Sequence, residues 1–158
     1  MIHMNKPQTI ADLKPAPYNP RVITDEAAAG LKFAMHEFGD LSGITFNVQT
    51  GNLVCGHQRV KQLPPETALA EHRAATDDTG TVGYAEAHIG GSVWPVRLVD
   101  WPLAKEKAGN VAANAETITG DFTADAGAII VEISGVVDAS VVRHAERCST
   151  ISQRLSGA

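Results

Sequence analysis

The chain has 158 residues, which suffices for one domain with a sizeable core and is too short for two domains of ordinary size. A formal net charge of −5 argues against a protein that coats nucleic acid non-specifically, because such proteins carry a broad excess of lysine and arginine. The two cysteines, Cys55 and Cys148, lie far apart and suggest neither a zinc site nor a disulfide framework. Because no signal peptide or membrane span is evident, we expect a cytoplasmic protein without a membrane partner.

The first predicted helix is bounded by clear signals at both ends. Residues 7–23 contain four prolines and should be extended or turning. Thr24 can cap the helix that follows, and Asp25 lies in its first turn, where a carboxylate suits the helix dipole. Apolar residues then recur at helical spacing until Phe38, and Gly39 supplies a stop. The pattern predicts a helix from about Asp25 to Phe38.

A hairpin and a short helix are predicted next. Apolar residues alternate with polar ones over 44–48 and resume at 53–54, and Gly51 lies in the connection between them. This arrangement is typical of two antiparallel strands joined by a tight turn. A short helix should follow over about 56–63. It should end there because two prolines come directly after it.

The segment 64–92 is interpreted as an insertion. One helical turn is expected around Thr67–Ala75, and the rest is rich in aspartate, threonine and glycine, which is typical of a surface loop. We assign its residues no role. The segment "VWPVRLVD" (93–100) then predicts a strand, in which Pro95 suggests either an edge position or a strand start.

The last third of the chain is predicted to be helical. One helix is expected within 102–118, and two more at about 124–134 and 138–155. The final helix has an apolar face opposite a basic one, so it should pack on its own domain, on an acidic partner, or on a second copy to form a homodimer. The order of elements predicts an α+β domain with a small mixed β-sheet over 1–122 and a C-terminal helical extension over 123–158.

The most informative short motif is "GHQR", between the second strand of the hairpin and the short helix. Gly56 leaves room for a ligand to approach the backbone, and the first amides of a helix point outward without intrahelical partners. Arg59 offers a planar cation suited to phosphate or carboxylate, and His57 can donate a hydrogen bond and gain charge near neutral pH. The motif therefore indicates an anion site, although a turn glycine with a surface arginine is an alternative.

Several motifs, taken in order, resemble the ParB-like domains of the ParB/sulfiredoxin fold that are common in phages and prophages. The resemblance spans roughly residues 10–125, and its specificity comes from the order of the motifs. The matching segments are "LKPAPYNPR" (13–21), a helix ending in "FGD" (38–40), "FNVQTGNLVCGHQRVKQL" (46–63), "WPVRLVD" (94–100) and "AGNVAANAETITGDF" (108–122).

The resemblance implies a set of site residues. In that family the turn that matches the "GHQR" motif binds the phosphates of a nucleotide, a loop arginine approaches the same cleft, and a helix with two asparagines helps to coordinate a magnesium–triphosphate. The residues that match are Gly56, His57, Gln58 and Arg59 in the turn, Arg21 in the loop, and Asn110 and Asn114 on the helix, with Asn114 as the metal ligand. If the domain is an enzyme, His57 and Glu116 are the catalytic candidates.

The resemblance implies a domain that binds a nucleoside triphosphate (ATP or CTP) with Mg²⁺ and acts in DNA-related metabolism of a phage or mobile element. The partner would be DNA or a DNA-processing protein. The segment after residue 122 is too short for the helix-turn-helix and dimerisation regions of partitioning ParB proteins. Cys55 precedes the turn glycine, unlike a sulfiredoxin nucleophile, and is interpreted as a small buried strand residue.

Two other functions are compatible with the sequence. The first is a phosphoryl-transfer or hydrolytic enzyme on the same fold, an ATPase, kinase or DNase, which would need a base such as His57 and a metal. The second is a protein-interaction module that keeps a vestigial nucleotide site.

Overall fold

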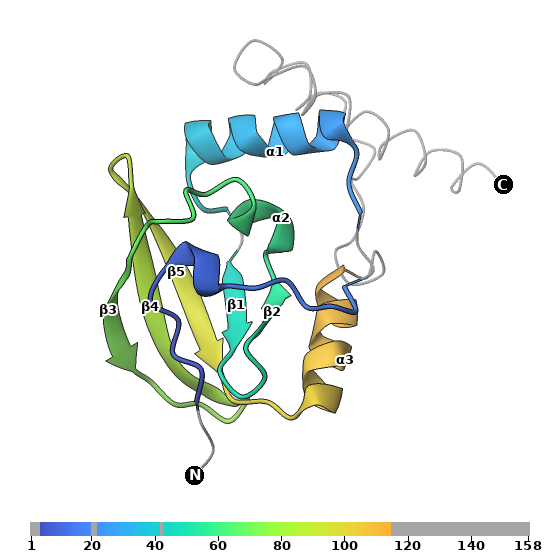
Figure 1. The fold of residues 1–158 in the computed structure, drawn as a ribbon, viewed down its shortest axis with the longest axis vertical. Coiled ribbons are helices and arrows are strands. Elements are labelled where there is room, and N and C mark those ends of the chain that lie inside the picture. Colours follow the sequence, from blue (N-terminus) through green and yellow to red (C-terminus); the bar gives the residue numbers. More distant parts are fainter. Residues whose placement is uncertain (1–3, 20–21, 42, 115–158) are drawn as a thin grey trace, which may run out of the picture.

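A computed structural model describes residues 4–19, 22–41 and 43–114 of the chain (Figure 1). These residues form a five-stranded mixed sheet with helices packed around it, which confirms the predicted α+β class with a small mixed sheet. In chain order the elements are η1 (Ile10–Asp12, a 3₁₀ helix), α1 (Asp25–Phe38), β1 (Ile44–Asn47), β2 (Asn52–Cys55), α2 (His57–Val60), β3 (Leu69–Ala74), β4 (Thr81–Ile89), β5 (Ser92–Val99) and α3 (Leu103–Asn114). The helices predicted at 124–134 and 138–155 lie outside the described residues.

Helix α1 has the bounds that its sequence predicts. The Thr24 side chain accepts a hydrogen bond from the Ala27 amide at 3.1 Å, which satisfies one of the first amides of the helix. At the other end Gly39 adopts a φ of 72°, and its amide donates to the Met35 carbonyl at 3.0 Å. Because this conformation is in the left-handed region, glycine ends the helix at little steric cost.

The sheet has the strand order β2-β1-β5-β4-β3. Strands β1 and β2 form the predicted antiparallel hairpin, with Phe46 opposite Leu53. Strand β1 pairs in parallel with β5, and β4 is antiparallel to both β5 and β3. The core lies on the face of the sheet that α2 and the N-terminal segment cover (Figure 1), and Ile10, Met35 and Leu63 join it from outside the sheet.

The prediction of a helical turn and a surface loop within 64–92 is wrong. Leu69–Ala74 forms the edge strand β3, and Thr81–Ile89 forms the long strand β4. Leu69 is buried in the core, and its amide donates to the Gln8 carbonyl at 2.7 Å. This local sequence favours helix, but long-range pairing with the N-terminal segment and with β4 overrides that preference.

The expectation of an edge position for the Pro95 strand is also wrong, because β5 lies in the centre of the sheet. A proline inside a central strand needs a position where its missing N–H is not required for strand pairing, and β5 provides one. The pairing of β5 with β1 begins only at Val96, so at Pro95 the strand has a neighbour on the β4 side alone, where Glu86 lies opposite. The proline therefore occupies a stretch of β5 that still has one open side.

A buried carboxylate joins α3 to the hairpin. Glu106, in the first turn of α3, has no solvent-exposed surface. Four side chains donate hydrogen bonds to it: Tyr18 at 2.6 Å, Asn47 at 2.6 Å, Asn52 at 3.0 Å, and Thr50. Burial alone raises the pKa of Glu106, but the hydrogen bonds outweigh it, so the pKa lies below its ordinary value. The carboxylate is therefore ionised at neutral pH.

Asn47, which is fully buried, extends this network to the segment before α3. Its Nδ2 donates to the Trp101 carbonyl at 2.8 Å, and its Oδ1 accepts from the Trp101 amide at 3.1 Å. The asparagine thus pairs with the Trp101 backbone as another strand residue would.

Among the described residues, no helix has the length and apolar character needed to cross a membrane.

Replacing Glu106 by glutamine should destabilise the protein by about 3 kcal/mol, because hydrogen bonds to a charged group contribute about 1.5–3 kcal/mol and unsatisfied buried donors cost about 1–3 kcal/mol each. Either orientation of the new amide places an NH₂ group against an asparagine Nδ2, of Asn47 or of Asn52. Urea unfolding measures the loss. Glu66→Gln, at an exposed position, should change stability by less than about 0.5 kcal/mol, and equal stability of both variants would contradict the assignment.

Candidate functional site

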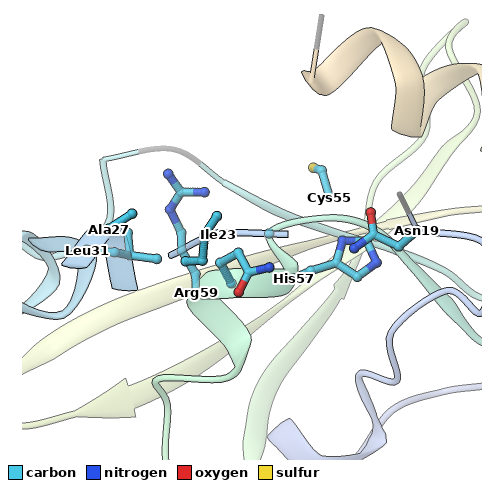
Figure 2. Close-up of a pocket in the computed structure, with 9 residues that line it drawn as sticks. Asn19, Ile23, Ala27, Leu31, Cys55, His57 and Arg59 are labelled. Atoms are coloured by element: carbon cyan, nitrogen blue, oxygen red, sulfur yellow. The ribbon is translucent and has the colours of Figure 1, made fainter. Parts of the chain in front are cut away.

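The "GHQR" turn forms one side of a pocket of about 140 Å³ (Figure 2). The turn side consists of Cys55, Gly56, His57, Gln58 and Arg59. Asn19, Ile23 and two α1 residues, Ala27 and Leu31, form the remainder. Drug-sized ligands occupy pockets of at least about 300 Å³, so this one accommodates one end of a ligand, such as a phosphate group.

Gly56 is required by the geometry of the turn. Its φ of 88° and ψ of 14° lie in the left-handed region. A Cβ at this position would lie 3.1 Å from Ile44 Cγ1 and 3.2 Å from Ile44 Cα, so a side chain here would press against strand β1. The glycine lets the chain leave β2 and enter α2 directly above β1, which places the next three residues at the pocket.

His57 is only 7% exposed, and its ring is fixed by the N-terminal segment. Its Nε2 accepts a hydrogen bond from the Ala16 amide at 3.2 Å. Since that nitrogen is an acceptor, Nδ1 carries the proton. Burial, together with the nearby charge of Lys61, lowers the pKa of His57, so the ring is neutral at neutral pH.

The geometry therefore gives His57 the chemistry of a neutral donor. The sequence suggested a histidine that gains charge near neutral pH and a possible catalytic base. In the folded protein the Nε2 lone pair that a base would use is engaged by Ala16, and burial disfavours the cation. The Nδ1–H is the group that the ring can offer to a pocket ligand.

Arg59 is the cation of the pocket. Its side chain is partly exposed and extends from α2 beside Ile23, on the side where Ala27 and Leu31 lie (Figure 2). No carboxylate of the described residues forms an ion pair with it, and none of the lining residues is acidic. An arginine that lies beside an apolar wall and has no counter-ion among the described residues favours an anionic ligand.

Helix α3, which carries the two asparagines of the predicted site, supports the pocket structurally. Asn110 is fully buried, and its Nδ2 donates to the Val54 carbonyl at 2.9 Å and to Asn19 Oδ1 at 3.3 Å. It does not line the pocket, but Asn19, which it contacts, does. Arg21, Glu116 and the side chain of Asn114 lie outside the described residues.

Sequence reasoning missed part of the pocket. Cys55 was expected to be buried, but it is partly exposed, lines the pocket and is a free thiol. The apolar wall was also missed, although Ile23, Ala27 and Leu31 are spaced four residues apart, which would place them on one side of a helix. This four-residue spacing of apolar residues was visible in the sequence, but most amphipathic helices share it, so it does not identify a pocket.

Comparison with known proteins adds no assignment. A scan of the sequence against protein-family models finds no match, and a search of curated proteins finds no significant match. The function of the protein therefore has to be inferred from the pocket geometry and from the residues that form it.

The neutral state of His57 predicts a pH dependence of stability. A lowered pKa in the folded protein means that the unfolded chain binds the proton more readily, so the free energy of unfolding should fall as the pH decreases below 6.5. His57→Gln keeps an acceptor for the Ala16 amide and removes the titration, so the decrease should be smaller. Urea unfolding above and below pH 6.5 measures both slopes. A His57→Gln slope equal to that of the wild type would contradict the prediction.

Proposed function

We infer that the pocket binds the phosphate group of a nucleotide, with Arg59 as the main anion-binding side chain. The observation that carries this proposal is the position of Arg59. It lines a pocket that contains no acidic residue among its lining residues, and no carboxylate of the described chain pairs with it. A guanidinium group can form two parallel hydrogen bonds with phosphate oxygens, which gives both affinity and orientation.

Other groups of the same turn support phosphate binding. The Nδ1–H of His57 is a donor that burial keeps uncharged at neutral pH, so it orients an oxygen without adding positive charge. Gly56 lets the backbone turn closely above strand β1, and this turn brings the first residues of α2 to the pocket. The side chains of Ile23, Ala27 and Leu31 form an apolar wall beside Arg59, so no neighbouring acid on that side competes with an anion for the guanidinium group.

We further propose that the ligand is a nucleoside triphosphate with Mg²⁺, either ATP or CTP. The chain would then be a ParB/sulfiredoxin-like domain that acts in DNA-related metabolism of a phage or mobile element. The support is the ordered resemblance of the sequence motifs, together with the position of the "GHQR" motif at the pocket. Magnesium is usually held by substrate phosphates and one or two carboxylates. Because no described lining residue is a carboxylate, the phosphates would hold the ion chiefly themselves.

Catalysis is not part of the proposal. Phosphoryl transfer needs a base that orients the attacking group. The Nε2 lone pair of His57 is engaged by the Ala16 amide, and Glu116 lies outside the described residues. Among the described residues that line the pocket, there is no carboxylate, and the only imidazole has its Nε2 lone pair engaged, so none of them is available as this base.

Isothermal titration with ATP, CTP and GTP in the presence of Mg²⁺ tests the proposal. Arg59→Ala should weaken binding by about ten- to a hundredfold, since a charge-assisted bond contributes about 1.5–3 kcal/mol. Arg59→Lys should restore part of the affinity, because it keeps the charge and loses the bidentate geometry.

Arg73→Ala is the matched control for this experiment. Arg73 is an exposed arginine of β3 whose guanidinium lies over the Tyr84 ring at 4.8 Å, and it does not line the pocket. This variant should bind as the wild type does. Equal affinities of the wild type and Arg59→Ala, or no binding of any nucleotide, would leave the turn with a structural role only.

A further inference from the structure

A second cluster of ligand-bearing side chains lies on strands β3 and β4, and none of its members lines the pocket. It consists of Glu71, Glu86 and His88. One ligand atom from each residue, a carboxylate oxygen or an imidazole nitrogen, lies within 4.8 Å of the others. The cluster therefore contains two carboxylates and one imidazole, a donor set that several divalent ions accept.

Strand geometry explains how β4 presents two of the ligands. Successive side chains alternate between the two faces of a strand. Ala85 and Ala87 are completely buried in the core, so Glu86 and His88 both project from the opposite face of the sheet. Because β4 is paired on both sides, by β3 and by β5, this part of the site has a rigid backbone.

An irregularity in β3 supplies the third ligand. The register between β3 and β4 shifts between Ala70, which pairs with Glu86, and Arg73, which pairs with Tyr84. Glu71 lies within this bulge and has a φ of 50°, an uncommon conformation for a residue other than glycine. The bulge places the Glu71 carboxylate 4.0 Å from His88 Nε2.

The spacing is close to that of a tetrahedral metal site. Zinc lies about 2.0–2.2 Å from oxygen and nitrogen ligands, so two ligands of a tetrahedral site are about 3.4 Å apart. His88 Nε2 lies 3.3 Å from Glu86 Oε2, which fits this value, and 4.0 Å from Glu71 Oε1. The Glu71 side chain is 67% exposed, so a change of rotamer can close the remaining gap.

The local charges also favour a cation. Within the described part of the chain, neither Glu71 nor Glu86 forms an ion pair with a lysine or arginine. The arginine nearest along β3, Arg73, stacks on the Tyr84 ring. Two carboxylates thus converge on one imidazole, and a divalent ion between them would replace their mutual repulsion with attraction.

We propose that Glu71, Glu86 and His88 bind a divalent first-row transition ion, of which zinc is the best match to the mixed oxygen and nitrogen ligands. Three protein ligands leave at least one coordination position for water. The ion would tie the bulge of the edge strand β3 to the C-terminal half of β4, and this role is independent of the nucleotide pocket.

Titration of the metal-depleted full chain with ZnCl₂ by calorimetry tests the proposal. The wild type should bind one zinc ion in this site and unfold at a higher temperature in its presence. His88→Ala and Glu86→Gln should each weaken this binding at least about tenfold, since each removes one direct ligand. Co²⁺ offers a spectroscopic readout, because a tetrahedral site with bound cobalt gives intense visible absorption that these variants should lose.

Two further variants keep the test decisive. Glu71→Gln alters an exposed side chain, so it should fold normally and still weaken zinc binding. His36→Ala removes an exposed histidine of α1 and should leave the affinity unchanged. Failure of the wild type to bind zinc, or a zinc affinity in both His88→Ala and Glu71→Gln that equals the affinity of the wild type, would show that the cluster is an exposed ion-pair group without a metal.

Discussion

The buried carboxylate of Glu106 is the constraint on which the arrangement of the described domain depends. An ionised group without solvent contact is tolerated only when its hydrogen-bonding capacity is satisfied by the protein. Here the donors come from the N-terminal segment, through Tyr18, and from the β1–β2 hairpin, through Asn47, Thr50 and Asn52. Displacement of any of these segments would leave the charge partly unsatisfied, so the network fixes α3, the hairpin and the N-terminal segment relative to one another.

The pocket inherits its geometry from this arrangement. Asn110 lies one helical turn after Glu106 on the same side of α3, and it holds the Val54 carbonyl and the Asn19 side chain. Val54 lies two residues before the turn glycine, and Asn19 lines the pocket. Helix α3 therefore supports the pocket through the hydrogen bonds of Asn110. The family resemblance implies a different role for this asparagine, which is contact with a nucleotide. Within the turn itself, His57 is engaged by the N-terminal backbone, whereas Arg59 lines the pocket and forms no ion pair with a described carboxylate.

Local signals account for the elements that the sequence predicted well. The bounds of α1 follow from the Thr24 cap and from Gly39, whose effects extend over a single helical turn. The hairpin follows from alternation around a tight turn, and the start of α2 follows from Gly56. The "GHQR" motif was also recognisable as one side of a site, because its members are consecutive in sequence. The opposite wall was not, since it comes from residues that are distant along the chain.

The sequence by itself determined the α+β class, the ends of α1, the hairpin and the presence of a cation beside a turn glycine. Tertiary structure alone decided that Leu69–Ala74 is a strand, that β5 is central, and that His57 is a neutral, hydrogen-bonded ring. The physical reason is the range of the interactions. Caps and turns act within a few residues, whereas strand pairing, burial of Glu106 and the pKa of His57 depend on partners that only the folded chain brings together.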